Sequence, residues 1–204
     1  GIIGNVSLAK VRADAGDDVR KELEGVEKAA VRAAGLTRQL LTFSRGGEPV
    51  KKTIGLADLI RESATFSLRG ANVRCAFDLD GDLWTVEGDR EQLSQVIQNL
   101  AINANQAMPN GGVLAVRAEN LHMDASSVAD PLPPGRYVRV VFEDDGLGIP
   151  KDQLGKIFDP YFTTKQSGSG LGLATVYSIV DKHGGRIEAA SEPAVIELTG
   201  VDFG

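Results

Sequence analysis

The first 46 residues place apolar and polar side chains at helical spacing. In the second part of this stretch, apolar or small residues recur at alternating steps of four and three, the heptad spacing of a narrow helical seam. These positions are Val19, Leu23, Val26, Ala30, Ala33, Thr37 and Leu40. The pattern ends at Leu41-Thr42-Phe43-Ser44-Arg45, and Gly46-Gly47-Glu48-Pro49 then breaks it. Residues 1–46 therefore predict two helices joined at residues 13–17. An amphipathic hairpin packed on its own domain is one interpretation, and the narrow seam and the linker favour a dimerising bundle.

From residue 50 onward, short strand patterns alternate with helical ones. Strands are predicted at residues 50–54, 73–79, 84–86, 113–121, 137–143, 186–190 and 194–198, and helices at 56–68, 90–108 and 170–183. The second and third strands are expected to form a hairpin that turns at Asp80-Gly81-Asp82. This mixture predicts an α+β sandwich, in which helices cover one face of a mixed sheet. We expect two domains, a helical hairpin over residues 1–46 and an α+β domain over residues 47–204.

Composition narrows the classes of function. Lys and Arg number 22 against 28 Asp and Glu, a net charge of −6, which argues against a nucleic-acid partner. The single cysteine, Cys75, excludes an intrachain disulfide and fits a reducing cytoplasm. No apolar run is long enough to cross a bilayer, and two histidines are too few for a zinc site. The first residues already lie in a helical pattern, so we expect a piece of a longer protein, whose membrane attachment stays open.

Uncharged amide side chains recur every four residues along the predicted helix 90–108. They are Gln95, Asn99 and Asn103, and an apolar stripe lies beside them. On an isolated helix such amides are usually solvated surface. Amide oxygens are also hard donors of the kind that magnesium prefers, so the helix alone leaves both interpretations open.

Two glycine clusters follow the strand 137–143. The first is Asp144-Asp145-Gly146-Leu147-Gly148-Ile149. It is either an ordinary aspartate-glycine turn or a site at which a carboxylate accepts a hydrogen bond from the amine of adenine. The second, Gly168-Ser169-Gly170-Leu171-Gly172-Leu173, opens a helix, where unpaired N–H groups and the helix dipole favour an anion such as phosphate. Its spacing and the segment before it fit neither the dinucleotide fingerprint nor the Walker loop.

Four motifs occur in a family-specific order. Asn99–Ala104 resembles the asparagine box of sensor histidine kinases, and Asp144–Ile149 their first glycine box. Phe158-Asp159-Pro160-Tyr161-Phe162-Thr163-Thr164-Lys165 is similar to their phenylalanine box, and Gly168–Leu173 to their second glycine box. Leu41–Arg45 matches the usual end of their helical hairpin. The chain is thus identified as a member of this family, with the Bergerat ATP-binding fold shared by DNA gyrase, heat-shock chaperones and mismatch-repair ATPases.

The resemblance implies a site for ATP and Mg²⁺. The residues it assigns to nucleotide binding are Asn99, Asn103, Asp144, Gly146, Gly148, Lys165, Gly168, Gly170, Leu171 and Gly172. Asn103 is expected to hold magnesium on the phosphates, with support from Asn99, and Asp144 to recognise adenine. Gly146 and Gly148 would shape the base pocket. The second glycine box would form the hinge of a lid over residues 151–167 and would contact phosphate. Lys165 in this lid is expected to be a further phosphate contact, although lid residues vary within the family. We expect this lid to be mobile without nucleotide.

The resemblance also implies transfer of the γ-phosphoryl group to a histidine and then to an aspartate of a response regulator, in a homodimer held by the hairpin. Hydrolytic members carry a glutamate base where this chain has Asn99, and an amide cannot take a proton. The alternative is a nucleotide-binding dimerisation module, or an ATPase of this fold without kinase activity.

Two features depart from the family pattern. The hairpin contains no histidine, since His122 and His183 lie in the second domain, so the chain as given is not expected to phosphorylate itself there. We expect His183 to cap or pack its helix and His122 to be exposed. The C-terminus lacks the usual glycine-threonine step, which leaves the register of the last strand open.

Overall fold

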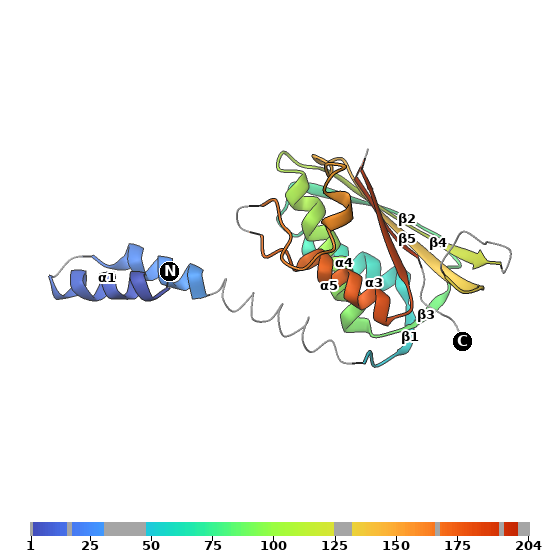
Figure 1. The fold of residues 1–204 in the computed structure, drawn as a ribbon, viewed down its shortest axis with the longest axis horizontal. Coiled ribbons are helices and arrows are strands. Elements are labelled where there is room, and N and C mark those ends of the chain that lie inside the picture. The colour runs from blue at the N-terminus through green and yellow to red at the C-terminus, as the bar shows by residue number, and fades with distance from the viewer. Residues whose placement is uncertain are drawn as a thin grey trace. The chain divides into compact units, whose positions relative to one another are not determined.

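The computed structural model describes residues 2–15, 18–30, 48–124, 132–165, 168–191 and 194–199. The chain divides into two compact units, Gly1–Arg45 and Gly46–Gly204, which Figure 1 draws as ribbons. Among the described residues, no helix is both long and apolar enough to span a membrane.

The helical unit contains α1 (Ile2–Asp14) and a second helical stretch over residues 20–30. The two stretches approach closely, because a Cβ added at Gly25 would lie 2.6 Å from Nδ2 of Asn5. An ion pair of 2.5 Å joins Arg12 to Glu22, whose side chain is 7% exposed. Leu23, in contrast, is 54% exposed, so the predicted seam does not face α1 at this position.

The rest of the predicted seam is described only in part. Val19 and Val26 are half-buried and Ala30 is exposed. The later seam positions, Ala33, Thr37 and Leu40, and the segment Leu41–Arg45 lie outside the described residues. What covers the exposed seam positions is therefore still a prediction.

The second unit is built on a five-stranded sheet. In spatial order its strands are β2 (Val73–Leu79), β4 (Gly112–Met123), β5 (Gly135–Asp144), β7 (Ala194–Thr199) and β6 (Arg186–Ser191). The β2–β4 pair is parallel and the other pairs are antiparallel. In Figure 1 the helices α3 (Leu56–Ser67), α4 (Arg90–Ala107) and α5 (Gly172–Lys182) lie on one side of this sheet. The predicted α+β sandwich is confirmed.

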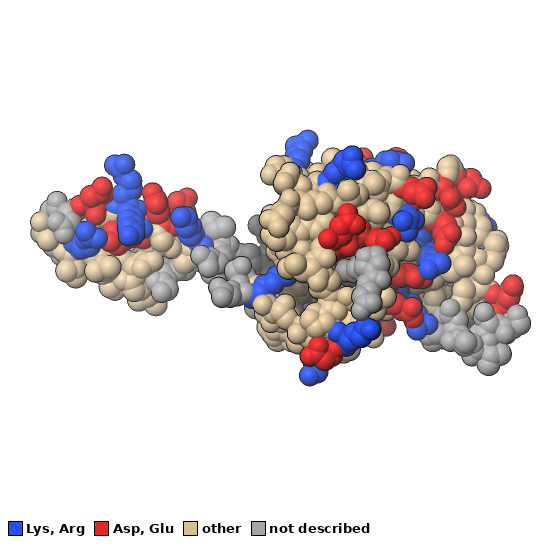
Figure 2. Space-filling model, turned by 90° about the horizontal axis from the view of Figure 1, so that it is seen from above, with Lys and Arg blue, Asp and Glu red and all other residues tan. Residues whose placement is uncertain are grey.

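Alternation along the strands explains this layering. In β4 the core side carries Leu114 and Val116, which are fully buried. The opposite side carries Arg117, which forms an ion pair of 2.9 Å with Glu143 on β5. The sheet thus has one apolar face for the helices and one charged face. Figure 2 shows acidic and basic side chains interspersed on the surface in view.

The predicted hairpin of residues 73–79 and 84–86 is wrong. β3 (Thr85–Gly88) pairs antiparallel with β1 (Lys52–Gly55) in a separate two-stranded sheet. The side chain of Asn120 on β4 accepts a hydrogen bond from the Trp84 N–H at 2.9 Å and donates to the Asp82 carbonyl at 3.0 Å. These bonds hold the turn at the end of β4, so the chain does not fold back onto β2. The register of β7, left open by the sequence, pairs Ala194 with Asp144.

Both helices that carry predicted motifs begin at identifiable positions. Asp89 caps α4, because its Oδ1 accepts hydrogen bonds from the N–H groups of Glu91 and Gln92 at 3.0 and 3.2 Å. α5 begins at Gly172, two residues later than predicted. The delay has a local cause, since Gly170 has a left-handed backbone with φ +67, which cannot belong to a right-handed helix.

Candidate functional site

Two asparagines of α4 meet the start of α5. Asn99 and Asn103 are one turn apart and half-buried. A Cβ added at Gly172 would lie 3.7 Å from Nδ2 of Asn103 and 3.9 Å from Oδ1 of Asn99. The first N–H groups of a helix have no partner within it and favour an anion. Amide oxygens and an anion-binding helix start therefore share one place.

An acidic group lies at the end of β5. Asp144 is the last residue of that strand, and its Oδ1 accepts a hydrogen bond from the Gly146 N–H at 3.0 Å. Burial raises the pKa of Asp144; the nearby Asp145 acts in the same direction, while the Gly146 hydrogen bond and Lys165 oppose the rise. The carboxylate is thus partly desolvated. A partly desolvated acceptor of this kind suits a neutral donor such as an aromatic amine.

The first glycine box is fixed against the end of α4. A Cβ added at Gly146 would lie 2.6 Å from Oδ1 of Asp144 and 2.7 Å from Cβ of Ala107. The next N–H, of Leu147, donates to the Ala107 carbonyl at 3.1 Å. Gly148 has φ +70, and the following N–H, of Ile149, donates to Oγ of Ser191 at 2.7 Å. Only a glycine at position 146 lets the backbone pass this close to α4.

The second glycine box closes the loop that ends the lid. The Tyr161 N–H donates to the Gly170 carbonyl at 2.9 Å, and both residues have left-handed backbones. A Cβ at Gly170 would lie 2.4 Å from the Tyr161 carbonyl carbon, and one at Gly168 2.5 Å from Oγ1 of Thr163. Leu171 is fully buried and so anchors this box in the core.

The described part of the lid is anchored at its base. It contains the 3-10 helix η1 (Leu154–Lys156), and Ile157 after it is 6% exposed. The ring of Phe158 lies 5.9 Å from that of Tyr177 on α5. Residues 166 and 167 lie outside the described residues. The burial of Ile157 was not predicted, because most of residues 151–167 are polar.

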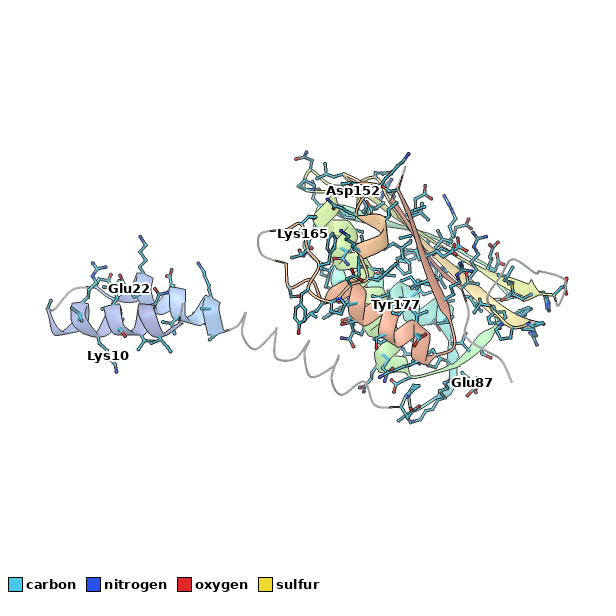
Figure 3. The ribbon with its side chains drawn as sticks, in the orientation of Figure 1. Lys10, Glu22, Glu87, Asp152, Lys165 and Tyr177 are labelled. Atoms are coloured by element: carbon cyan, nitrogen blue, oxygen red, sulfur yellow. The ribbon has the colours of Figure 1, made fainter. Side chains whose placement is uncertain are left out.

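Lys165 contacts the side chain of Gln106 on α4. Its Nζ donates to Oε1 of Gln106 at 2.6 Å, near the end of α4 and away from Asn99; Figure 3 labels this lysine. Partial burial lowers the pKa of Lys165, and the Asp144 carboxylate acts in the opposite direction. Sequence reasoning missed Gln106, although it follows Asn103 by three residues and so shares its side of the helix.

The two histidines have different surroundings. His183, the C-cap residue of α5, is 1% exposed; its Nε2 accepts from the Asp89 N–H at 3.0 Å, and its Nδ1 lies 2.8 Å from the Ile179 carbonyl. An imidazole that accepts at one nitrogen and donates at the other is neutral, and burial lowers the pKa of His183. His122 is exposed, with its ring edge-on to Trp84 at 4.8 Å. Within the described ranges, no three His, Cys, Asp or Glu side chains are grouped to hold a metal.

Comparison with known proteins gives one family. The family described as "Histidine kinase-, DNA gyrase B-, and HSP90-like ATPase" matches residues 88–202. The sensor kinase CckA of Brucella abortus is 39% identical over 197 residues, which cover 94% of this chain and 21% of that protein. The sensor histidine kinase ZraS of Escherichia coli K12 is 34% identical over 184 residues, 89% of this chain and 37% of that protein. The chain thus spans well under half the length of these curated relatives.

The solved structures that resemble this chain include histidine kinases, as do its sequence relatives. The nucleotide-free catalytic domain of histidine kinase ThkA superposes with a TM-score of 0.61 at 31% identity, over 73% of this chain and 93% of that one. ThkA in complex with the response regulator protein TrrA gives a TM-score of 0.70 at 25% identity, over 97% of this chain and 57% of that one.

Proposed function

We propose how this chain binds MgATP and prepares phosphoryl transfer. It belongs to the histidine kinase-, DNA gyrase B- and HSP90-like ATPases and carries the ATP-binding catalytic domain of a sensor histidine kinase. The proposed site follows α4 from Asn99 to Ala107. Eight residues of helix span about 12 Å, a length that suits a nucleoside polyphosphate. One end of this span carries amides and a helix start, and the other a desolvated carboxylate. This difference between the two ends is the observation on which the proposal rests.

The base would bind at the Asp144 end. Its exocyclic amine would donate to the carboxylate, beside the backbone of Gly146 and Gly148. The close approach of Gly146 to Ala107 supports this placement, because it keeps side chains out of the pocket. GTP carries a carbonyl where adenine carries the amine, so the same carboxylate would select against it.

The phosphates would bind between α4 and the second glycine box. Asn103 would offer an amide oxygen to Mg²⁺ and Asn99 would support it. Mg²⁺ often takes one or two protein oxygens and completes its shell with phosphates and water, so this sparse donor set fits the ion. When bound, it would neutralise charge on the phosphates. Gly168, Gly170, Leu171 and Gly172 would supply the hinge and backbone N–H groups, and Lys165 a further cation.

The arrangement favours transfer to a protein acceptor over hydrolysis. Asn99 lies where a base would activate water, and its amide cannot accept a proton. Residues 1–46 contain no histidine, so the acceptor would come from outside the chain as given. We further propose that the parent protein is a homodimer joined through the helical hairpin and acts in the cytoplasm on a response regulator, as the complex of ThkA with TrrA suggests.

The test of this proposal is phosphate transfer. The chain is incubated with labelled MgATP and a separately supplied hairpin that carries an acceptor histidine. Acid-labile phosphate on the added hairpin supports the kinase. If ATP binds and no phosphate reaches any added acceptor, the alternative of a nucleotide-binding module without transfer is favoured. Phosphate released only to water would indicate an ATPase.

A further inference from the structure

We propose that Lys165 is an internal competitor for the base end of the nucleotide site, held on Gln106 when no nucleotide is bound and displaced when adenine enters. The inference rests on the proposed nucleotide site. It concerns two side chains, one from the lid and one from α4.

The contact places Lys165 at the base end. Its Nζ donates to Oε1 of Gln106 at 2.6 Å, across 59 positions of sequence. Gln106 directly precedes Ala107, whose carbonyl accepts the Leu147 N–H at 3.1 Å. The Lys165 ammonium and the first glycine box thus both contact the last turns of α4, and the ammonium interacts with the Asp144 carboxylate, the proposed partner of adenine.

The charges explain why this position competes with a base. The ammonium of Lys165 and the carboxylate of Asp144 attract each other, since each moves the other's pKa towards the charged form. An ammonium group is a hydrogen-bond donor only, and the exocyclic amine of adenine is likewise the donor that Asp144 would accept. The lysine thus presents to Asp144 a positively charged donor, in competition with the amine of the ligand.

A short movement would take Lys165 to the phosphates. Gln106 and Asn103 are three residues apart on α4, which is about 4.5 Å along the helix axis. That shift lies within the reach of a four-carbon side chain. The stem of the loop, the Tyr161–Gly170 hydrogen bond, can stay closed meanwhile. The ammonium would exchange Gln106 for a phosphate oxygen without unfolding of the lid.

Two variants separate the two positions of the lysine. Gln106→Ala removes the docking acceptor and leaves the cation, at an exposed helical position that tolerates alanine. Lys165→Met removes the cation from both positions. Lys156→Met, at an exposed lysine of η1, is the control for loss of one positive charge near the site. Adenosine and MgATP are each titrated in competition with a fluorescent adenine nucleotide.

Adenosine has no phosphate, so it reports only the competition. If Lys165 leaves Gln106 in only a minor fraction of the native molecules, removal of the lysine or of its acceptor tightens adenosine binding by about three- to tenfold in both variants. MgATP should bind tighter to Gln106→Ala by a similar factor and weaker to Lys165→Met, which loses the phosphate contact. The control should leave adenosine binding unchanged.

Unchanged adenosine affinity in both variants, with normal binding by the native protein, overturns the competition. Equal tightening by the Lys156→Met control also overturns it, because the effect would then be one of net charge. Absence of both adenosine and MgATP binding in the native protein would remove the nucleotide site itself, a different failure that is visible before any variant is made.

Discussion

His183 should make the 46–204 unit less stable in mild acid. Its Nε2 accepts the Asp89 N–H, and protonation would turn that nitrogen into a donor facing a donor. Burial lowers the pKa of His183, and Lys51 acts in the same direction, against the Ile179 carbonyl and Asp89. The unfolded chain then binds the proton more readily than the folded one. This contribution to stability is fully present above the unfolded pKa of about 6.5 and is lost as the pH falls below it.

The size of the effect follows from one proton. Between pH 6.5 and the folded pKa, stability should fall by about 1.4 kcal/mol per pH unit. His183→Phe keeps much of the ring volume but leaves the Asp89 N–H unpaired, at a cost of about 1–3 kcal/mol at neutral pH. This variant should be less stable at pH 7.5 and should have a flatter pH dependence. Urea unfolding at pH 7.5, 6.5 and 5.5 measures both.

The exposed histidine supplies the matched control. His122→Gln removes an exposed imidazole of the same unit and should keep the native slope. If His183→Phe loses stability with pH as steeply as the native protein, the buried neutral imidazole is not the source and the argument fails.

Three further outcomes are expected at the site. Gly170→Ala should weaken MgATP binding by at least tenfold, because the new Cβ would lie 2.4 Å from the Tyr161 carbonyl carbon. Gly155→Ala, whose added Cβ would have no atom within 4 Å, should bind MgATP as the native protein does. Equal MgATP affinities in the two variants would refute the role of the Tyr161–Gly170 contact. Asp144→Ala should lose discrimination between ATP and GTP, and an unchanged preference for ATP in the folded variant would exclude Asp144 as the base contact. In the native protein the affinity for ATP should fall on acidification at a higher pH than an ordinary aspartate would give, since the pKa of Asp144 is raised. Without nucleotide, amide hydrogens of residues 159–165 should exchange faster than those of α4, and equally slow exchange would contradict a mobile lid.

Local pattern was sufficient for much of the second unit. The apolar stripe predicted a helix over residues 90–108, within one residue of the observed α4, since this signal lies inside the helix itself. Asn99, Asn103 and Gly172 could be linked before the fold was known, because the motif order of the family brings them together. The structure places these three side by side.

Non-local contacts explain what the sequence did not predict. β3 pairs with β1, and the turn that precedes β3 is held by two hydrogen bonds of the Asn120 side chain, which lies 36 positions from Trp84. Gln106 could not be identified from the sequence, because an exposed glutamine near a helix end is common. Only its hydrogen bond with Lys165 in the structure marks it as part of the site. In the helical unit, the heptad spacing identified apolar positions but not which face meets α1, where Glu22 is buried and Leu23 is exposed.

The most direct test of the nucleotide site is a calorimetric titration of ATP with and without Mg²⁺, on the native chain and on Asn103→Ala. The account predicts that Mg²⁺ tightens ATP binding to the native chain and that Asn103→Ala abolishes this gain while it keeps the binding of adenosine. Gln95→Ala, another amide on the same helix, should behave as the native chain. No binding of ATP at millimolar concentration, or an equal gain from Mg²⁺ in native chain and Asn103→Ala, would contradict the account.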